Sequence, residues 1–430
     1  MGNLMTNIFK IRTILIMLAL FFPSKQVLAI GLTEILDLTL RTNVQIIAAE
    51  KDLEMQSEVI KQILSKKKPV VSANVSSERV WDLKNDGNDD GYSASITASY
   101  MLFDGYMTNH QIAAESYRVE ALKAEVQGIG QRIIYDSIIA YLNVLRNSRL
   151  VDLSKKNGIV LSQQLDATTS RYQLGELTRT DVAQATAALE SATSVLASRQ
   201  GALDIANSIF ETAVGMPPTG LDVNIRLPLL PKTLVEAKGL AISFNPTLKV
   251  NLFREKRAQA LLNAARSKNL PTLNFATSLS GGKRAFQSEF SNFDFGVVAS
   301  IPIYSGGSIK SGERQAQSEL ALTMTNSEIS RLAIAQSVMS AWSDFEVSTT
   351  VIIAREREVE AMELAYKGIL EEARLGSRTT LDVLNAEQDL LDTKTNLETA
   401  RSERLAAAYR LLLQMGTLTP SALGVEVASQ

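Results

Sequence analysis

Few residues in this chain have the types and spacing that catalysis or metal binding requires. The sequence of 430 residues contains no Cys, which excludes disulfides, thiolate metal sites and a lipid-anchored cysteine. Its single histidine, His110, cannot form a metal cluster by itself and is typical of a surface or interface residue. There is no Gly-rich phosphate loop, and no Ser–His–Asp or Cys–His pair is evident. The sequence therefore predicts a protein that is not an enzyme and uses no cofactor.

Two polar segments combine glycine, threonine and aspartate at the same spacing. They read RYQLGELTRTDVAQA and ARLGSRTTLDVLNAE, and Gly376 follows Gly175 by the same step as Asp382 follows Asp181 (376 − 175 = 382 − 181 = 201). In each segment Thr-x-x-Asp is a capping-box pattern, in which the acid satisfies the first turn of a helix. Glycine suits the left-handed residue that ends the preceding helix. Capping explains both pairs, but it gives Arg378 in the second segment no role.

The same step relates landmarks over most of the chain. With nearly equal offsets, the pairs are Asn43 with Asn245, Pro69 with Pro271, Tyr141 with Trp342, and the Phe103-Asp104-Gly105 turn with Tyr304-Ser305-Gly306. A step this constant indicates one structural unit used twice. Its period is far too long for a solenoid, so we expect duplication of a whole subdomain.

The elements that must position these segments divide the chain into five parts. A basic start, an apolar stretch and the small residues before position 30 predict a signal peptide at 1–29. We expect repeat 1 at 30–215, a linker or equatorial segment at 216–232, repeat 2 at 233–416, and a C-terminal equatorial segment and tail at 417–430. Removing the signal, which holds three basic and no acidic residues, changes the net charge from −2 to about −5. This charge argues against a nucleic-acid partner.

Each repeat reads as helix, hairpin, long helix, turn and helix. Helical patterns cover 33–67, about 105–172 and about 180–214 in the first repeat, and 308–374 and 381–415 in the second. A helix of about 67 residues is roughly 100 Å long and needs partners along its whole course. The two shorter helices of a repeat, placed end to end, have about the same combined length.

Alternating residues at 70–103 and 271–304 predict two β-hairpins. Each arm has about 11 residues, the length that a tilted strand needs to cross a membrane. Trp81 and Tyr92 lie at the loop end, where interfacial aromatic residues are common. The acidic stretch 82–91 is expected to be an exposed loop rather than a calcium site. A soluble hairpin with one wet face is the alternative.

Four strands in one chain cannot close a membrane barrel. Small membrane barrels start at about eight strands, and open sheet edges in lipid would leave backbone groups unsatisfied. If the strands lie in a membrane, two to four copies of the chain must therefore share one barrel.

A signal peptide, duplicated halves, paired hairpins and two copies of Gly-x₅-Asp-Val together resemble the TolC-like outer-membrane channels. The resemblance covers 32–424, and its most specific part is 375–386. It implies an α+β membrane protein that forms a homotrimer. Four strands per chain would build a twelve-stranded outer-membrane β-barrel, continued by a long periplasmic α-helical barrel of coiled coils. It also implies export, driven by an inner-membrane ABC, RND or MFS-type transporter through a periplasmic adaptor (membrane fusion) protein.

The resemblance also implies a gate and a selectivity ring at the two polar segments. Thr180, Asp181 and Arg378 match the gate, in which Arg378 ties to the other turn. Asp382 matches an acidic ring that narrows the tunnel, and rings of carboxylates favour cations. The second ring aspartate of the family falls on Asn385, which leaves three ring carboxylates per trimer instead of six.

Two further points follow from the same comparison. The turns at Gly175 and Gly376 are the implied docking sites of the adaptor. The gate tyrosine of the family falls on Ala373, which removes a hydroxyl partner from the closed state.

The main alternative is a soluble periplasmic coiled-coil protein, structural or adaptor-like, whose hairpins form small sandwich-type sheets. Within the channel interpretation, the cargo stays open between proteins exported by type I secretion and small toxic molecules, because the inner-membrane partner selects it.

Overall fold

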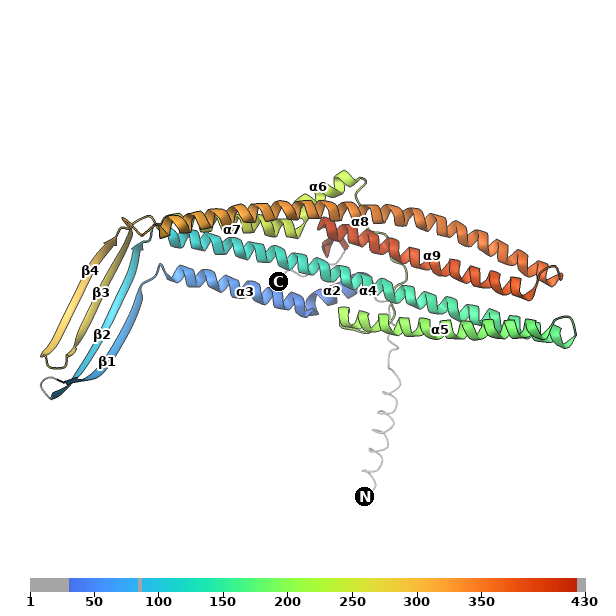
Figure 1. The fold of residues 1–430 in the computed structure, drawn as a ribbon, viewed down its shortest axis with the longest axis horizontal. Helices are drawn as coiled ribbons and strands as arrows, with labels where there is room; N and C mark the ends of the chain where they lie inside the picture. Colours follow the sequence, from blue (N-terminus) through green and yellow to red (C-terminus); the bar gives the residue numbers. More distant parts are fainter. Residues whose placement is uncertain (1–30, 84–86, 424–430) are drawn as a thin grey trace, which may run out of the picture.

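The protein is a long, gently curved molecule with a β-sheet at one end and two helical turns at the other (Figure 1). The computed structural model describes residues 31–83 and 87–423, so the expected signal peptide and the last residues of the tail lie outside the described part. The helices are α2 (Leu32–Thr42), α3 (Val44–Ser65), α4 (Met107–Gln173), α5 (Arg179–Val214), α6 (Leu234–Phe244), α7 (Pro246–Ser267), α8 (Ser308–Arg374) and α9 (Thr380–Met415), followed by the short 3₁₀ helix η2 (Ser421–Leu423).

The helices of the two halves have equal lengths. α2 and α6 have 11 residues, α3 and α7 have 22, α4 and α8 have 67, and α5 and α9 have 36. Both long helices lie where the sequence predicted them. α4 is continuous although it contains three glycines, because other helices pack along its whole length.

The expected single helix at 33–67 is wrong, because the chain breaks at Asn43. This residue is extended (ψ 122°), and its side-chain oxygen accepts a hydrogen bond from Gln45 N at 2.9 Å. Asn245 breaks the second half in the same way and caps Thr247 N at 2.9 Å. An asparagine that caps a new helix in this manner separates two helical patterns that share one periodicity.

The helices form four parallel columns (Figure 1). α4 packs against α3 and α5 on one side and against α7 and α9 on the other, and α8 packs against α7 and α9. α3 and α5 thus share one column, as do α7 and α9, whereas each long helix is a column by itself. α6 lies beside α8 and α9.

The core lies at mid-length, where the shorter helices meet. Tyr141 of α4 and Phe210 of α5 are fully buried, with ring centroids 6.3 Å apart. The segment 215–233, called the strap below, runs from the end of α5 to α6. The Tyr141 hydroxyl donates to the Asp222 carbonyl of the strap at 2.7 Å, and Ile225 of the strap packs on the core. The strap is therefore held to the columns by both polar and apolar contacts.

The sheet has the order β1-β2-β3-β4, and all neighbours are antiparallel. Its strands are β1 (Val70–Asp82), β2 (Gly87–Phe103), β3 (Thr272–Lys283) and β4 (Glu289–Ser300). β1 follows α3, β2 leads into α4, β3 follows α7 and β4 leads into α8. The lateral order of the strands therefore equals the order of the columns.

Two details of the hairpins differ from the expectation. Most of the stretch expected as a loop, 82–91, is strand, because β1 reaches Asp82 and β2 already begins at Gly87. The last strand ends at Ser300 instead of continuing to Ile303. Pro302 has no N–H to donate to a neighbouring strand, which accounts for this earlier end.

The pairing register gives the sheet one apolar and one polar face. Ile96 lies opposite Ala73 and Leu279, and Leu279 lies opposite Phe293, so that apolar side chains align across all four strands. Their neighbours in sequence align on the other face, where Ser95 lies opposite Asn74 and Ser280. The apolar face is exposed: Phe293 is 68% and Phe295 is 74% accessible. Among the described helices, none is long and apolar enough to cross a membrane.

Candidate functional site

The two helical turns at the far end from the sheet have nearly the same geometry. Gly175 (φ 79°) follows α4 and Gly376 (φ 78°) follows α8, and both are in the left-handed region that glycine favours. In each turn the second residue after the helical cap donates to the carbonyl five positions before it: Glu176 N donates to Arg171 O, and Ser377 N donates to Glu372 O, both at 3.0 Å. These bonds satisfy carbonyls that the helix ends leave free, which fixes the turns.

Each predicted capping box is present. Asp181 accepts from Thr178 N at 2.9 Å and from the Thr178 hydroxyl at 2.7 Å, and Asp382 accepts from Thr379 N at 2.9 Å and from the Thr379 hydroxyl at 2.8 Å. The hydrogen bonds from Thr178 hold the pKa of Asp181 below its usual range. Those from Thr379, backbone first, lower the pKa of Asp382. Both carboxylates are therefore ionised near neutral pH in the single chain.

Arg378 pairs within its own turn. Its Nε donates to Glu372 Oε2 at 2.8 Å in the single chain, whereas the family resemblance implies a tie to Thr180 and Asp181 of the other turn. Thr180 is exposed at the start of α5. The pair lies at the surface, with side chains 47% and 51% accessible, so water weakens it. A role of Thr180, Asp181 and Arg378 in a gate stays a prediction.

The link between the two turns comes from a residue that the sequence reasoning missed. The side chain of Thr380, at the start of α9, lies close enough to Asp181 to contribute to its lowered pKa. Nearby, Leu384 of α9 packs with Leu161 of α4 and Ala192 of α5. The Thr379-Thr380 pair in the sequence was the available signal, but only the fold places it beside α5.

The other predicted site residues lie at the surface of the same end of the molecule, beside the two helical turns. Asn385 is exposed one turn beyond Asp382, and Ala373 is partly buried in the last turn of α8. Next to the glycines, Leu174 and Leu375 are 77% and 85% exposed. Exposed leucines on rigid turns offer an apolar contact to a partner protein.

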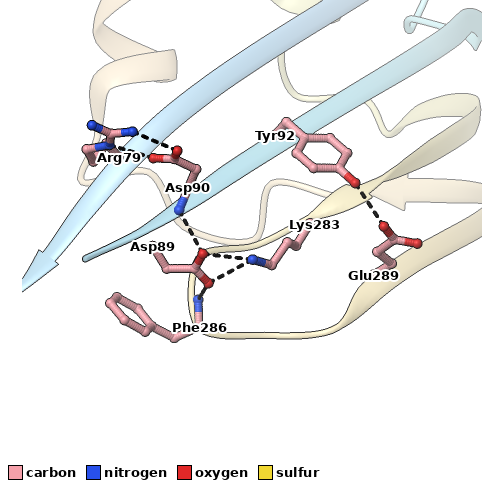
Figure 2. A network of polar contacts seen from close by, with 7 residues as sticks. All are labelled: Arg79, Asp89, Asp90, Tyr92, Lys283, Phe286 and Glu289. Carbon is pink, nitrogen blue, oxygen red and sulfur yellow. Dashed lines mark hydrogen bonds and ion pairs between the residues drawn. The ribbon is translucent and has the colours of Figure 1, made fainter. Parts of the chain in front are cut away.

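A second polar cluster joins the two hairpins at the outer end of the sheet. Lys283 Nζ of β3 donates to both oxygens of Asp89 of β2, at 2.7 and 3.0 Å, and Phe286 N donates to the same carboxylate at 2.8 Å (Figure 2). Arg79 holds Asp90 by two bonds of 2.6 and 2.8 Å, and the Tyr92 hydroxyl donates to Glu289 at 2.9 Å. The bonds of Asp89 and Tyr92 cross from the first hairpin to the second and hold their ends together, whereas the Arg79–Asp90 pair joins β1 to β2 within the first hairpin.

Within residues 31–83 and 87–423 no group of three or more His, Asp or Glu side chains could hold a metal ion. The described residues form a sheet with an apolar outer face, four long helical columns, and two charged helical turns at the end opposite the sheet.

The family model and the relatives that resemble this chain agree on one protein family. The sequence model described as "Outer membrane efflux protein" matches residues 35–216 and 239–417. The chain is 28% identical over 391 residues to the outer membrane efflux protein BepC of Brucella suis biovar 1, covering 90% of this chain and 86% of BepC. It is 24% identical over 364 residues to the alkaline protease secretion protein AprF of Pseudomonas aeruginosa, covering 81% of this chain and 74% of AprF.

The fold is similar to that of solved channel structures. A crystal structure of CusC superposes with a TM-score of 0.82 at 18% sequence identity, covering 90% of this chain and 92% of CusC. Sheet and columns are therefore arranged here as they are in that protein.

Proposed function

The chain belongs to the outer membrane efflux protein family, and we propose that it forms a trimeric channel that exports cargo across the periplasm and the outer membrane. Family membership makes it an outer-membrane protein with a periplasmic tunnel, and members of this family are channels rather than enzymes. It does not favour the alternative of a soluble periplasmic coiled-coil protein.

The single observation that carries the proposal is the sheet. Its apolar face is exposed over all four strands, and β1 and β4 each leave one edge without a partner in the chain. Unpaired strand edges cannot lie in lipid. Three copies joined edge to edge would give twelve strands in one closed barrel, with the serine-rich face lining the pore. The equal helix lengths support the proposed repeats at 30–215 and 233–416, joined by 216–232 and followed by 417–430.

The helical columns would continue this pore through the periplasm. α8 is buried at only three positions, Val338, Ala341 and Ile352, although it has 67 residues. Its long free side is suited to pack against the α3–α5 column of the next copy. The trimer would then have a ring of twelve columns, and the turns at Gly175 and Gly376 would close its periplasmic end.

We place the gate at these turns and the docking of a periplasmic adaptor on the same surface. The contacts of Arg378 and Asp181 are few and exposed, so a partner protein can replace them. Three copies of Asp382 around the axis would attract cations. An inner-membrane transporter of the ABC, RND or MFS type would supply the cargo. The names of BepC and AprF refer to efflux and to protease secretion, and both cargo classes fit such a duct.

Single-channel conductance in planar lipid bilayers tests the proposal. The purified protein is compared with Arg378→Ser and with the matched control Arg171→Ser, whose arginine pairs with Glu176 at 3.1 Å in the other turn. We expect a small cation-preferring conductance that increases several-fold in Arg378→Ser and little in the control. Absence of any conductance would contradict the channel. An equal increase in both variants would show that stiffness of the turns, and not Arg378 itself, keeps the pore closed.

A further inference from the structure

A pocket of about 280 Å³ lies at mid-length, far from both the turns and the sheet. The strap contributes three apolar side chains, Val223, Ile225 and Leu227. α4, α8 and α9 form the rest, including the buried Leu142 and Ile352. One end of this pocket is thus lined by apolar side chains of a segment that the core holds in place, and two of them, Val223 and Leu227, are themselves partly exposed.

The rest of the pocket is strongly positive. Four arginines line it, Arg146 and Arg149 from α4 and Arg401 and Arg404 from α9, together with a single carboxylate, Glu398. Two of them share that carboxylate: Arg149 and Arg401 lie 3.3 and 2.7 Å from Glu398, whose side chain is only 14% exposed. Arg401 also lies 3.7 Å from Glu356 of α8.

The other two arginines leave donors unused. Over the described residues, neither Arg146 nor Arg404 forms a hydrogen bond or ion pair, and Nε of Arg404 is buried without an acceptor. A buried donor with no partner is costly, and more so when it is charged. A water molecule would accept from Nε, but it would not balance the excess positive charge.

We propose that this pocket binds a small amphiphilic anion, with a phosphate or carboxylate group held by Arg404 and Arg146 and a short apolar body under the strap. The planar guanidinium group donates two parallel bonds, a geometry that suits oxyanions. The leucine, valine and isoleucine side chains favour an apolar body over a bare ion. The volume suits a single small ring or a short chain.

Binding here would join three parts of the molecule. The anion would contact α4 and α9, and its body would contact the strap. These helices lead to the turns at Gly175 and Gly376, so an occupied pocket stiffens the tunnel wall at mid-length without touching the gate. This role is independent of the cargo and of the proposed gate residues.

Phenyl phosphate is a suitable probe, because phosphorus NMR detects it in detergent that contains no phosphorus. Titration of the solubilised protein should shift and broaden the signal in a saturable way. Inorganic phosphate, which lacks the apolar body, should bind at least fivefold more weakly. Displacement by benzoate would show that a carboxylate is also accepted, and failure of benzoate to compete would restrict the site to phosphates.

Arg404→Gln and Arg146→Gln should each weaken phenyl phosphate binding about tenfold or more. The control is Arg331→Gln, whose arginine is exposed on α8 and paired with Glu328 at 2.6 Å, and it should leave binding unchanged. Circular dichroism and elution volume confirm that each variant folds, and two independent arginines keep the test valid if one variant does not. No saturable binding to the wild type, or equal binding by wild type and both pocket variants, would overturn the proposal.

Discussion

Gly416 ends α9 at a point where three helical segments meet, and replacing it should be far more damaging than replacing its counterpart in the first half. Gly416 accepts a hydrogen bond from Gln131 of α4 through its carbonyl at 2.8 Å. Asn245, between α6 and α7, donates to the Gln414 carbonyl at 2.9 Å. A Cβ on Gly416 would lie 2.5 Å from Asn245 Cα and 2.7 Å from Phe244 O. The backbones of two helical ends therefore touch here with no room for a side chain.

Gly215 is the matched control, because it ends α5 in the same conformation. Its φ is 87° against 75° for Gly416, but a Cβ there would meet only Thr42 Oγ1 at 4.0 Å. Alanine in the left-handed region costs about 1–2 kcal/mol, and this term applies to both sites. The clash at Gly416 adds about 1–3 kcal/mol or more, as overpacking does. We therefore expect the free energy of unfolding to decrease by about 1–2 kcal/mol in Gly215→Ala and by about 2–5 kcal/mol in Gly416→Ala.

Thermal denaturation of the detergent-solubilised protein, followed by circular dichroism at one heating rate, measures the difference. The fixed rate matters because large proteins often unfold irreversibly. The apparent melting temperature should fall at least twice as far for Gly416→Ala as for Gly215→Ala. Equal decreases would refute the reasoning, because they would mean that the junction of α9 with α6 and α7 relaxes freely around an added methyl group.

Three further predictions concern the two helical turns at Gly175 and Gly376. Thr379→Ala and Thr178→Ala should each remove about 1 kcal/mol of local stability by loss of a cap, seen as faster amide exchange in the turn that is changed and not in the other. Because the pKa values of Asp181 and Asp382 are lowered in the folded protein, their contribution to stability is complete above the ordinary aspartate range and is lost as pH falls through the lowered values. Amide protection at the two turns should thus stay constant from about pH 7 to about pH 5 and decrease below it, and a decrease already near pH 6 would contradict this assignment. Asn385→Asp should increase the permeability ratio of cations to anions, measured as the reversal potential in a salt gradient, and an unchanged ratio would place Asn385 away from the pore.

The sequence predicted the elements whose signals are local. The two long helices, the capping boxes at Asp181 and Asp382 and the alternation of the strands all depend on residues within a few positions of each other. The break at Asn43 was missed because the apolar pattern continues through it, and only the backbone angle shows the change.

Interactions between distant segments could not be predicted in this way. Asp89 lies in a strand instead of a loop: it pairs with Val80 in the β1–β2 ladder, and Lys283, which follows it by 194 positions, binds its carboxylate. Arg378 has an acidic neighbour in the sequence at Glu372, but nothing local decides between that partner and Asp181. The arginine pocket joins α4 to α9 and the strap, so no single segment indicates it.

The continuity of each strand with its own column has a consequence for the width of the proposed pore. Strands about 4.8 Å apart and tilted by about 40° each take about 6 Å of circumference, so twelve give a radius of about 12 Å. Helices about 9 Å apart would place twelve axes at a radius of about 17 Å, and subtracting the radius of the helical backbone, about 2 Å, leaves about 15 Å. One element per column therefore yields backbone radii that differ by only about 3 Å between the two parts, although a helix is about twice as wide as a strand. An unfolded chain or a bulky molecule passing from periplasm to exterior would meet only a small change in width at the junction.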